Sequence, residues 1–130
     1  MKQQLVNFTF LVNEYDEAIK YFTEKLEFVL LEDTMLSPEK RWVRIAPINS
    51  EGTGLLLAKA TSDLQIKTVG KQFGDRVGFF LHTDNFWITF EKMKEKGVSF
   101  IEEPRKEVYG TVVVFKDLYG NKWDMIEPIK

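Results

Sequence analysis

The sequence predicts an α+β fold built from two similar halves, each with the order strand, helix and three further strands. Two observations carry this prediction. A buried-strand pattern at residues 5–12 is followed at once by an amphipathic helix pattern. The same succession returns from residue 76, and a shift of 71 residues, which places Asn7 on Gly78, superposes the two strands and helices. We therefore expect a tandem βαβββ arrangement.

The first half begins with the apolar run LVNFTFLV, which is typical of a buried strand. Asn13 can cap the helix that follows, with Asp16 three residues on in the capping-box position. The helix has one apolar face on an otherwise charged segment, and its members are Tyr15, Ala18, Ile19, Phe22 and Leu26. Turn-forming residues then separate three expected strands, at residues 28–34, 41–46 and 54–59.

The second half follows a polar segment without periodicity at residues 60–75, which we take as the connector. Its first strand is expected at residues 76–83. Asp84 can cap the next helix, and Gly97 would end it. The apolar face of that helix comprises Phe86, Phe90 and Met93. The remaining strands are expected at residues 98–104, 109–117 and 122–128, with a tight turn at 118–121.

The two modules, at about 5–59 and 76–128, are expected to form a single domain over residues 1–130. Each module has one helix, which covers one face of its sheet. Two such sheets placed edge to edge would form a curved mixed sheet around a cleft. Alternate residues of several strands would line that cleft. The alternative is two ferredoxin-like or otherwise unrelated α+β halves.

The composition limits the class of protein. The chain has 18 basic and 20 acidic residues, a net charge of −2 and no Lys/Arg block, so it lacks the electrostatic footprint of nucleic-acid binding. It has no cysteine, which excludes disulfides and a thiol nucleophile. The start MKQQLVNFTF lacks the apolar region of a signal peptide, and no segment approaches transmembrane length. We expect a cytoplasmic protein that binds neither nucleic acid nor membrane.

Three segments carry a resemblance to a known family. They are YDEAIKYFTEKLEF at 15–28, TDNFWITFEKMKEKGVSF at 83–100 and YGTVVVFKDLYGNKWDMIEP at 109–128. In these segments the chain resembles the vicinal oxygen chelate superfamily, which contains glyoxalase I, the extradiol dioxygenases and the bleomycin-resistance proteins. One departure is Glu27, where the family often has Gly. The backbone there either becomes left-handed at some cost or turns differently.

The resemblance also implies where a divalent metal would be held. The four ligand positions fall on Asn7, on Leu57 or a neighbour, on Gly78 and on Asp124. Only Asp124 is a good ligand type, since Asn7 is a weak neutral donor and the others have no donor. His82, the one histidine, lies four residues beyond Gly78 and would need a different geometry. We therefore predict no metal and no other cofactor, with a divalent metal as the alternative.

A pocket on this scaffold would combine aromatic and polar side chains. By strand alternation, Thr9 lies on the face of Asn7, and Phe80 lies on the face of Gly78. Trp42 shares a face with Arg44, but the sequence does not show which face. Core packing is the competing interpretation for the aromatic residues. The predicted ligand-binding residues are Asn7, Thr9, Trp42, Phe80, Tyr109 and Asp124.

Catalysis without a metal is a further possibility. Asp124 in an apolar cleft would have a raised pKa and could act as a general base beside His82, so these two are the candidate catalytic residues. Arg41, Arg44 or Arg105 could hold a carboxylate or phosphate. For each arginine, a solvated surface position is the alternative.

The predicted function is binding of a small, partly aromatic molecule in the sheet cleft without the usual metal, in the manner of the antibiotic-binding resistance proteins. The resemblance implies a homodimer. The alternative is a metal-dependent lyase, isomerase or dioxygenase of glyoxalase type. A third possibility is a protein-interaction module whose aromatic face binds a partner.

Overall fold

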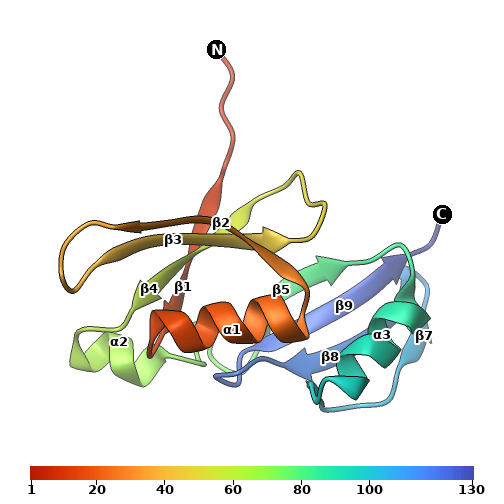
Figure 1. The fold of residues 1–130 in the computed structure, drawn as a ribbon. Helices are drawn as coiled ribbons and strands as arrows, with labels where there is room; N and C mark the ends of the chain where they lie inside the picture. Colours follow the sequence, from red (N-terminus) through yellow and green to blue (C-terminus); the bar gives the residue numbers. More distant parts are fainter. The chain divides into compact units, whose positions relative to one another are not determined.

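The computed structural model describes residues 1–130 and combines helices with two mixed β-sheets, as the sequence predicts. The chain forms two compact units, Met1–Val69 and Gly70–Lys130, called the N-terminal and C-terminal units below. Figure 1 shows in each unit a helix lying against one face of the sheet. None of the helices combines the length and apolar character needed to cross a bilayer.

The N-terminal unit has a four-stranded sheet in the order β1-β4-β3-β2. β1 is parallel to β4, and the other neighbours are antiparallel. Its elements are β1 (Asn7–Val12), α1 (Tyr15–Lys25), β2 (Phe28–Met35), β3 (Arg41–Pro47), β4 (Gly54–Lys59) and α2 (Asp63–Thr68).

The C-terminal unit repeats this plan in a five-stranded sheet with the order β5-β9-β8-β6, in which β7 also pairs with β8. β5 is parallel to β9, as β1 is to β4. Its elements are β5 (Val77–His82), α3 (Phe86–Glu95), β6 (Ser99–Phe100), β7 (Arg105–Glu107), β8 (Gly110–Lys116) and β9 (Lys122–Pro128). The predicted βαβββ succession is therefore present in the first half, and the second half contains it with one additional strand, β7.

Three local predictions were wrong. The connector contains the short helix α2, capped by the Ser62 hydroxyl, which accepts from the backbone N–H of Gln65. The expected strand at 98–104 is only two residues long, and β7 follows it as a separate strand. Tyr109 lies in the turn between β7 and β8 rather than at the start of a strand.

The helix caps also differ by one residue from the prediction. α1 has its N-cap at Glu14, with no side-chain cap bond, instead of at Asn13. α3 is capped by Asn85, whose side chain accepts from the backbone N–H of Ile88, instead of by Asp84. Asp84 and Asn85 are adjacent short polar side chains that compete for the cap of α3, whereas α1 begins without a side-chain cap.

The residue after each long helix has a left-handed backbone. Gly97, which follows the C-cap of α3, has φ 85°, as expected for a helix stop. Glu27, which follows the C-cap of α1, has φ 56°. The first of the two alternatives for Glu27 is therefore correct, and an L-residue adopts this conformation at a cost.

Aromatic rings fill the core beneath each helix. In the N-terminal unit Phe10 of β1 meets Phe22 of α1 edge to face, with ring centroids 5.2 Å apart. In the C-terminal unit Trp123 of β9 lies between Phe79 and Phe115, stacked at centroid distances of 4.6 and 5.6 Å. Most of the aromatic surplus therefore packs the core.

The turn between β8 and β9 is held by a buried carboxylate. Asp117 is only 6% exposed and accepts hydrogen bonds from the indole Nε1 of Trp123, from the side-chain amide of Asn121 and from the backbone N–H groups of Tyr119 and Asn121. Burial raises the pKa of Asp117, and these four donors oppose the rise. The donors make this carboxylate a fixed structural element of the turn.

Candidate functional site

The face of the N-terminal sheet opposite α1 carries the predicted polar residues. Phe10 and Val12 of β1 are fully buried beneath α1, so the alternating positions Asn7 and Thr9 lie on the other face, called the open face below. Their exposure agrees with this, since Asn7 is half-buried and Thr9 is exposed.

The open face also contains Trp42 and Arg44. Val43 and Ile45 of β3 are fully buried, so their neighbours on the strand point the opposite way. Arg44 confirms this orientation, because its Nε donates to Oδ1 of Asn7 at 2.8 Å. The structure thus shows which face of β3 carries Trp42 and Arg44, a choice that the sequence does not decide.

The Arg44 side chain crosses the sheet and is held at both ends of its guanidinium. Nε bonds Asn7, and Nη1 bonds Oε1 of Glu32 on β2 at 2.8 Å. Gly54 of β4 lies on this path, and a Cβ there would be 3.6 Å from Nη2 of Arg44. This is an ordinary van der Waals distance, and the tighter contact of such a Cβ would be with the backbone oxygen of Ile45, at 3.0 Å.

The C-terminal sheet has its own open face, opposite α3. Trp123 and Met125 of β9 are buried on the helix side, so Asp124 between them lies on the open face. Its register partners are Phe80 on β5 and Val114 on β8. Phe80 is 63% exposed, which leaves its ring available for contact.

Asp124 is a carboxylate without a hydrogen-bond partner. Its Oδ1 is buried and accepts no hydrogen bond. Burial raises the pKa of Asp124, the nearby charge of Arg105 lowers it, and that of Glu102 raises it. A buried acceptor without a donor is costly, and in native structures it calls for an explanation such as a ligand.

His82 and Tyr109 are less closely associated with Asp124. His82 is exposed and lies on the same open face, paired in register with Ile126, but no hydrogen bond joins it to Asp124. Tyr109 is 48% exposed, and hydrogen bonds from Arg105 to Glu107 and to Tyr109 raise the pKa of that guanidinium. The proposed catalytic pair thus shares a face without direct contact.

The residues at the family's metal-ligand positions do not fit a metal ion. The register Thr9↔Leu56 matches Phe80↔Asp124, so the position equivalent to Asp124 in the first half is Leu56, a neighbour of Leu57. Leu56 has no donor atom, and no group of three or more His, Asp or Glu side chains comes together anywhere in residues 1–130.

The two first-strand positions are also committed to other contacts. Oδ1 of Asn7 accepts from the cationic Arg44. A Cβ at Gly78 would lie 2.0 Å from the ring of Phe73, so this ring occupies the space of any side chain at that position. In the N-terminal unit the first-strand position is thus bonded to a guanidinium, and in the C-terminal unit a phenyl ring fills the space beside it.

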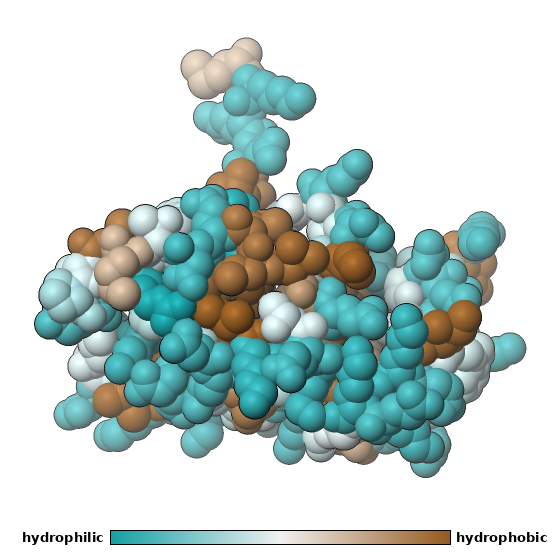
Figure 2. All heavy atoms as spheres, in the orientation of Figure 1, coloured by the Kyte–Doolittle hydropathy of each residue, from teal (hydrophilic) through white to brown (hydrophobic).

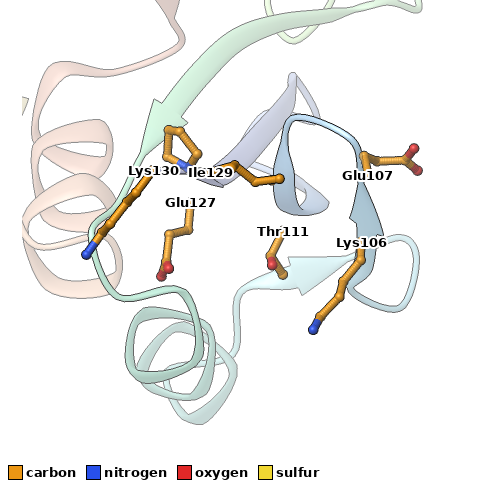
Figure 3. Close-up of a pocket in the computed structure, with 8 residues that line it drawn as sticks. Lys106, Glu107, Thr111, Glu127, Ile129 and Lys130 are labelled. Atoms are coloured by element: carbon orange, nitrogen blue, oxygen red, sulfur yellow. The ribbon is translucent and has the colours of Figure 1, made fainter.

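A hollow of about 410 Å³ lies elsewhere, near the ends of β7, β8 and β9. Its lining includes Thr111 and Glu127, which are paired in register. In Figure 3 the ammonium groups of Lys106 and Lys130 lie at opposite sides, with the Glu127 carboxylate between them. Oε1 of Glu127 accepts from the backbone N–H of Phe86 at the start of α3, and no predicted ligand-binding residue lines the hollow.

Two relevant residues were missed in the sequence. Glu32 holds Arg44, but a bulge between Leu30 and Glu32 interrupts the alternation that would have placed it. Glu102 accepts from Arg105 and from the backbone N–H of Val114, beside Asp124. It lies in the irregular segment after β6, which the sequence predicts to be part of a strand at 98–104.

Comparison with known proteins agrees with this architecture. The family model of the Glyoxalase/Bleomycin resistance protein/Dioxygenase superfamily matches residues 4–125. An uncharacterized protein of Shewanella frigidimarina (strain NCIMB 400) is 46% identical over 98% of this chain and 95% of its own length. The uncharacterized protein YetH of Bacillus subtilis (strain 168) is 31% identical over 93% of this chain and 95% of its own.

Solved structures show the same fold. The crystal structure of UcmS2 has a TM-score of 0.81 at 27% identity, covering 98% of this chain and 99% of that one. TnmS3, an antibiotic binding protein from Streptomyces sp. CB03234, has a TM-score of 0.80 at 24% identity, covering 98% of each chain.

Proposed function

Because the chain belongs to the Glyoxalase/Bleomycin resistance protein/Dioxygenase superfamily, we propose that it binds a small, partly aromatic molecule on the open faces of its sheets and does so without a metal ion. The observation that carries the proposal is the buried, unpartnered Oδ1 of Asp124 beside the exposed ring of Phe80. A ligand that stacks on the ring and donates a hydrogen bond to the carboxylate would satisfy both.

The N-terminal unit supports the same proposal. Trp42 and Arg44 lie two residues apart on the open face of β3, with Asn7 and Thr9 on β1. An apolar or aromatic surface with a few fixed polar groups is the usual composition of a small-molecule site. TnmS3 shares this fold and is an antibiotic binding protein, so the binding of an antibiotic has a precedent on this scaffold.

A catalytic role remains a narrower proposal. Asp124, with its raised pKa, is the candidate general base, and His82 lies on the same open face. The metal-dependent lyase, isomerase or dioxygenase is the competing function. It requires an ion that Asn7, Leu56 and Gly78 offer little to hold.

We also propose a homodimer in the cytoplasm, with no nucleic acid or membrane among its partners. The resemblance implies the dimer, and the net charge of −2 supports the absence of nucleic acid. On the edge strand β2 of the N-terminal unit, three consecutive apolar residues are exposed, namely Val29, Leu30 and Leu31. Figure 2 shows apolar atoms gathered over the first half of β2.

The test is thermal denaturation with a panel of aromatic small molecules, in chelator and again with Ni²⁺, Zn²⁺, Mn²⁺ or Fe²⁺. We expect the unfolding temperature to rise with one ligand class in chelator, because binding to the folded state alone stabilises it. Trp42→Leu should reduce the rise. Trp87→Leu, which changes an exposed Trp on α3, should leave it intact.

A different result would favour the metal-dependent enzyme over ligand binding without a metal. If no ligand raises the unfolding temperature while a divalent metal does, and Asp124→Ala abolishes that effect, the metal-dependent enzyme replaces this proposal. Retained turnover in Asp124→Ala would exclude Asp124 as the base.

A further inference from the structure

Two arginines, one on the helix side of β3 and one in the C-terminal unit, are each bonded to two carboxylates. Arg41 donates from Nε and Nη2 to Asp33 and from Nη1 to Asp16. Arg105 donates from Nε to Glu102 and from Nη1 to Glu107, and it also bonds Tyr109. Because two carboxylates are bonded to each of these guanidinium groups, the positive charge of each is neutralised by its partners.

Arg44 differs in both respects. It has one carboxylate, Glu32, and its second partner is the neutral amide oxygen of Asn7. The guanidinium presents five N–H donors, and Nη2 makes no hydrogen bond within the protein. Arg44 thus has an uncommitted donor and is less neutralised by acids than Arg41 or Arg105, and it is the arginine of the N-terminal open face.

The free donor is held in place by its bonded neighbours. The side chain of Arg44 is 22% exposed, so it is largely covered while still reachable. Bonds to Asn7 and Glu32 fix the plane of the guanidinium, and Nη2 lies over Gly54, where no side chain intervenes. A donor fixed before binding costs less conformational entropy when a ligand arrives.

Trp42 adds an aromatic surface at a matching distance. It is two residues from Arg44 on the same face of β3, which corresponds to about 7 Å along a strand. This spacing suits a flat ring over the indole with an acidic substituent directed at the guanidinium.

We infer that Arg44 recognises an acidic oxygen of the ligand, so that the preferred ligand is an aromatic carboxylic acid rather than its neutral analogue. The inference rests on the proposed function, since it names the ligand class for the open face of the N-terminal unit, on which Arg44 and Trp42 lie. The guanidinium supplies the positive charge at Asn7 that a metal ion would have supplied in a metal-dependent relative.

The experiment measures the dissociation constants of 2-naphthoate and 2-naphthamide by calorimetry. These probes share the ring and differ in charge. We expect the wild-type protein to bind the acid about tenfold more tightly, as one charge-assisted hydrogen bond would produce. Arg44→Met should remove the preference, and Arg41→Met, on the helix side of the same strand, should keep it.

Glu32→Gln provides a test of opposite sign. The amide keeps the shape of the Arg44 partner and removes its charge, so 2-naphthoate should bind severalfold more tightly while 2-naphthamide is unchanged. A purely structural role for Arg44 does not predict this gain. If Arg44→Met fails to fold, Glu32→Gln decides the question.

The possible results distinguish failure of this inference from failure of the proposed function. Equal binding of both probes by wild-type protein, or a preference unaffected by Arg44→Met and Glu32→Gln, overturns the inference and leaves the proposed function standing. Binding of neither probe at millimolar concentration, with no other aromatic ligand raising the unfolding temperature, overturns the proposed function and this inference with it.

Discussion

The two units place different chemistry at equivalent positions of their open faces. Leu56 and Asp124 share one register, paired with Thr9 and Phe80 respectively. On the N-terminal face the central cation, Arg44, is held by two partners, whereas on the C-terminal face the buried oxygen of Asp124 has none. The two units therefore share the path of the backbone, whereas the side chains at equivalent positions differ in charge and in hydrogen bonding.

The closing hairpins of the two units differ in the same way. In the C-terminal unit the β8–β9 turn is built around the buried Asp117. In the N-terminal unit the β3–β4 connection, residues 48–53, is mostly exposed and contains Asn49 with φ 60°. One hairpin is fixed by a buried polar cluster and the other by local turn geometry.

The largest expected effect comes from removing this cluster. Asp117→Ala would leave the Trp123 indole N–H and the Asn121 amide buried without an acceptor, so the free energy of unfolding should fall by about 3 kcal/mol. Urea denaturation measures this. Asp84→Ala, at an exposed position, should change the value by less than about 0.5 kcal/mol. A loss equal to that of the control would show that the cluster contributes nothing.

The second prediction makes the two open faces alike. Asp124→Leu places the residue of the equivalent position, Leu56, where the unpartnered carboxylate lies. The free energy of unfolding should rise by about 1 kcal/mol, because a buried acceptor without a donor is removed. Ligand-induced stabilisation should be lost at the same time. Destabilisation by this change would mean that Asp124 has a favourable structural role.

The third prediction is a pH dependence that only the C-terminal face should show. Burial raises the pKa of Asp124 above its value in the unfolded chain, so the folded state holds the proton more tightly. The stability that protonated Asp124 contributes to the folded state is fully present below about pH 4, which is the pKa of this carboxyl in the unfolded chain. It is lost as the pH rises through the pKa of Asp124 in the folded state. Asp124→Asn should therefore match wild type near pH 4 and exceed it increasingly toward pH 7. Parallel stability curves from pH 4 to 7 would contradict the assignment.

The smallest effect concerns the residue after each long helix. Glu27 and Gly97 have the same left-handed conformation, with φ 56° and 85°. Glu27→Gly should raise the free energy of unfolding by about 0.5 kcal/mol, the relief of strain less the added freedom of the unfolded chain. Gly97→Ala should lower it. A destabilised Glu27→Gly would indicate that the contacts of Glu27 outweigh its backbone strain.

The fold was predictable because its signals are periodic and occur twice. The apolar faces of α1 and α3 and the alternation in β1, β3 and β9 all lie where the sequence places them. The short strand β7 and the helix α2 were not predictable, since three and six residues carry too little pattern. The cap of α3 failed because Asp84 and Asn85 compete within one residue, and that of α1 failed because this helix has no side-chain cap.

The sequence predicts a site residue only where the alternation of side chains along a strand determines which face of the sheet it occupies. Alternation placed Thr9 with Asn7, and Asp124 opposite the core. Alternation did not decide which face of β3 carries Trp42, since that depends on which of the neighbouring residues are buried. The Arg44–Asn7 bond joins residues 37 apart in sequence, and the Phe73 ring over Gly78 depends on a loop conformation. Neither has a local sequence signal.

The ring of Phe73 over Gly78 has a consequence for engineering a metal ligand into the chain. The imidazole introduced by Gly78→His would meet this ring, and a smaller residue at position 73 alone would leave a gap beside a glycine. An imidazole at position 78 therefore requires either a second substitution at position 73 or a displacement of the Phe73 ring, which is 47% exposed.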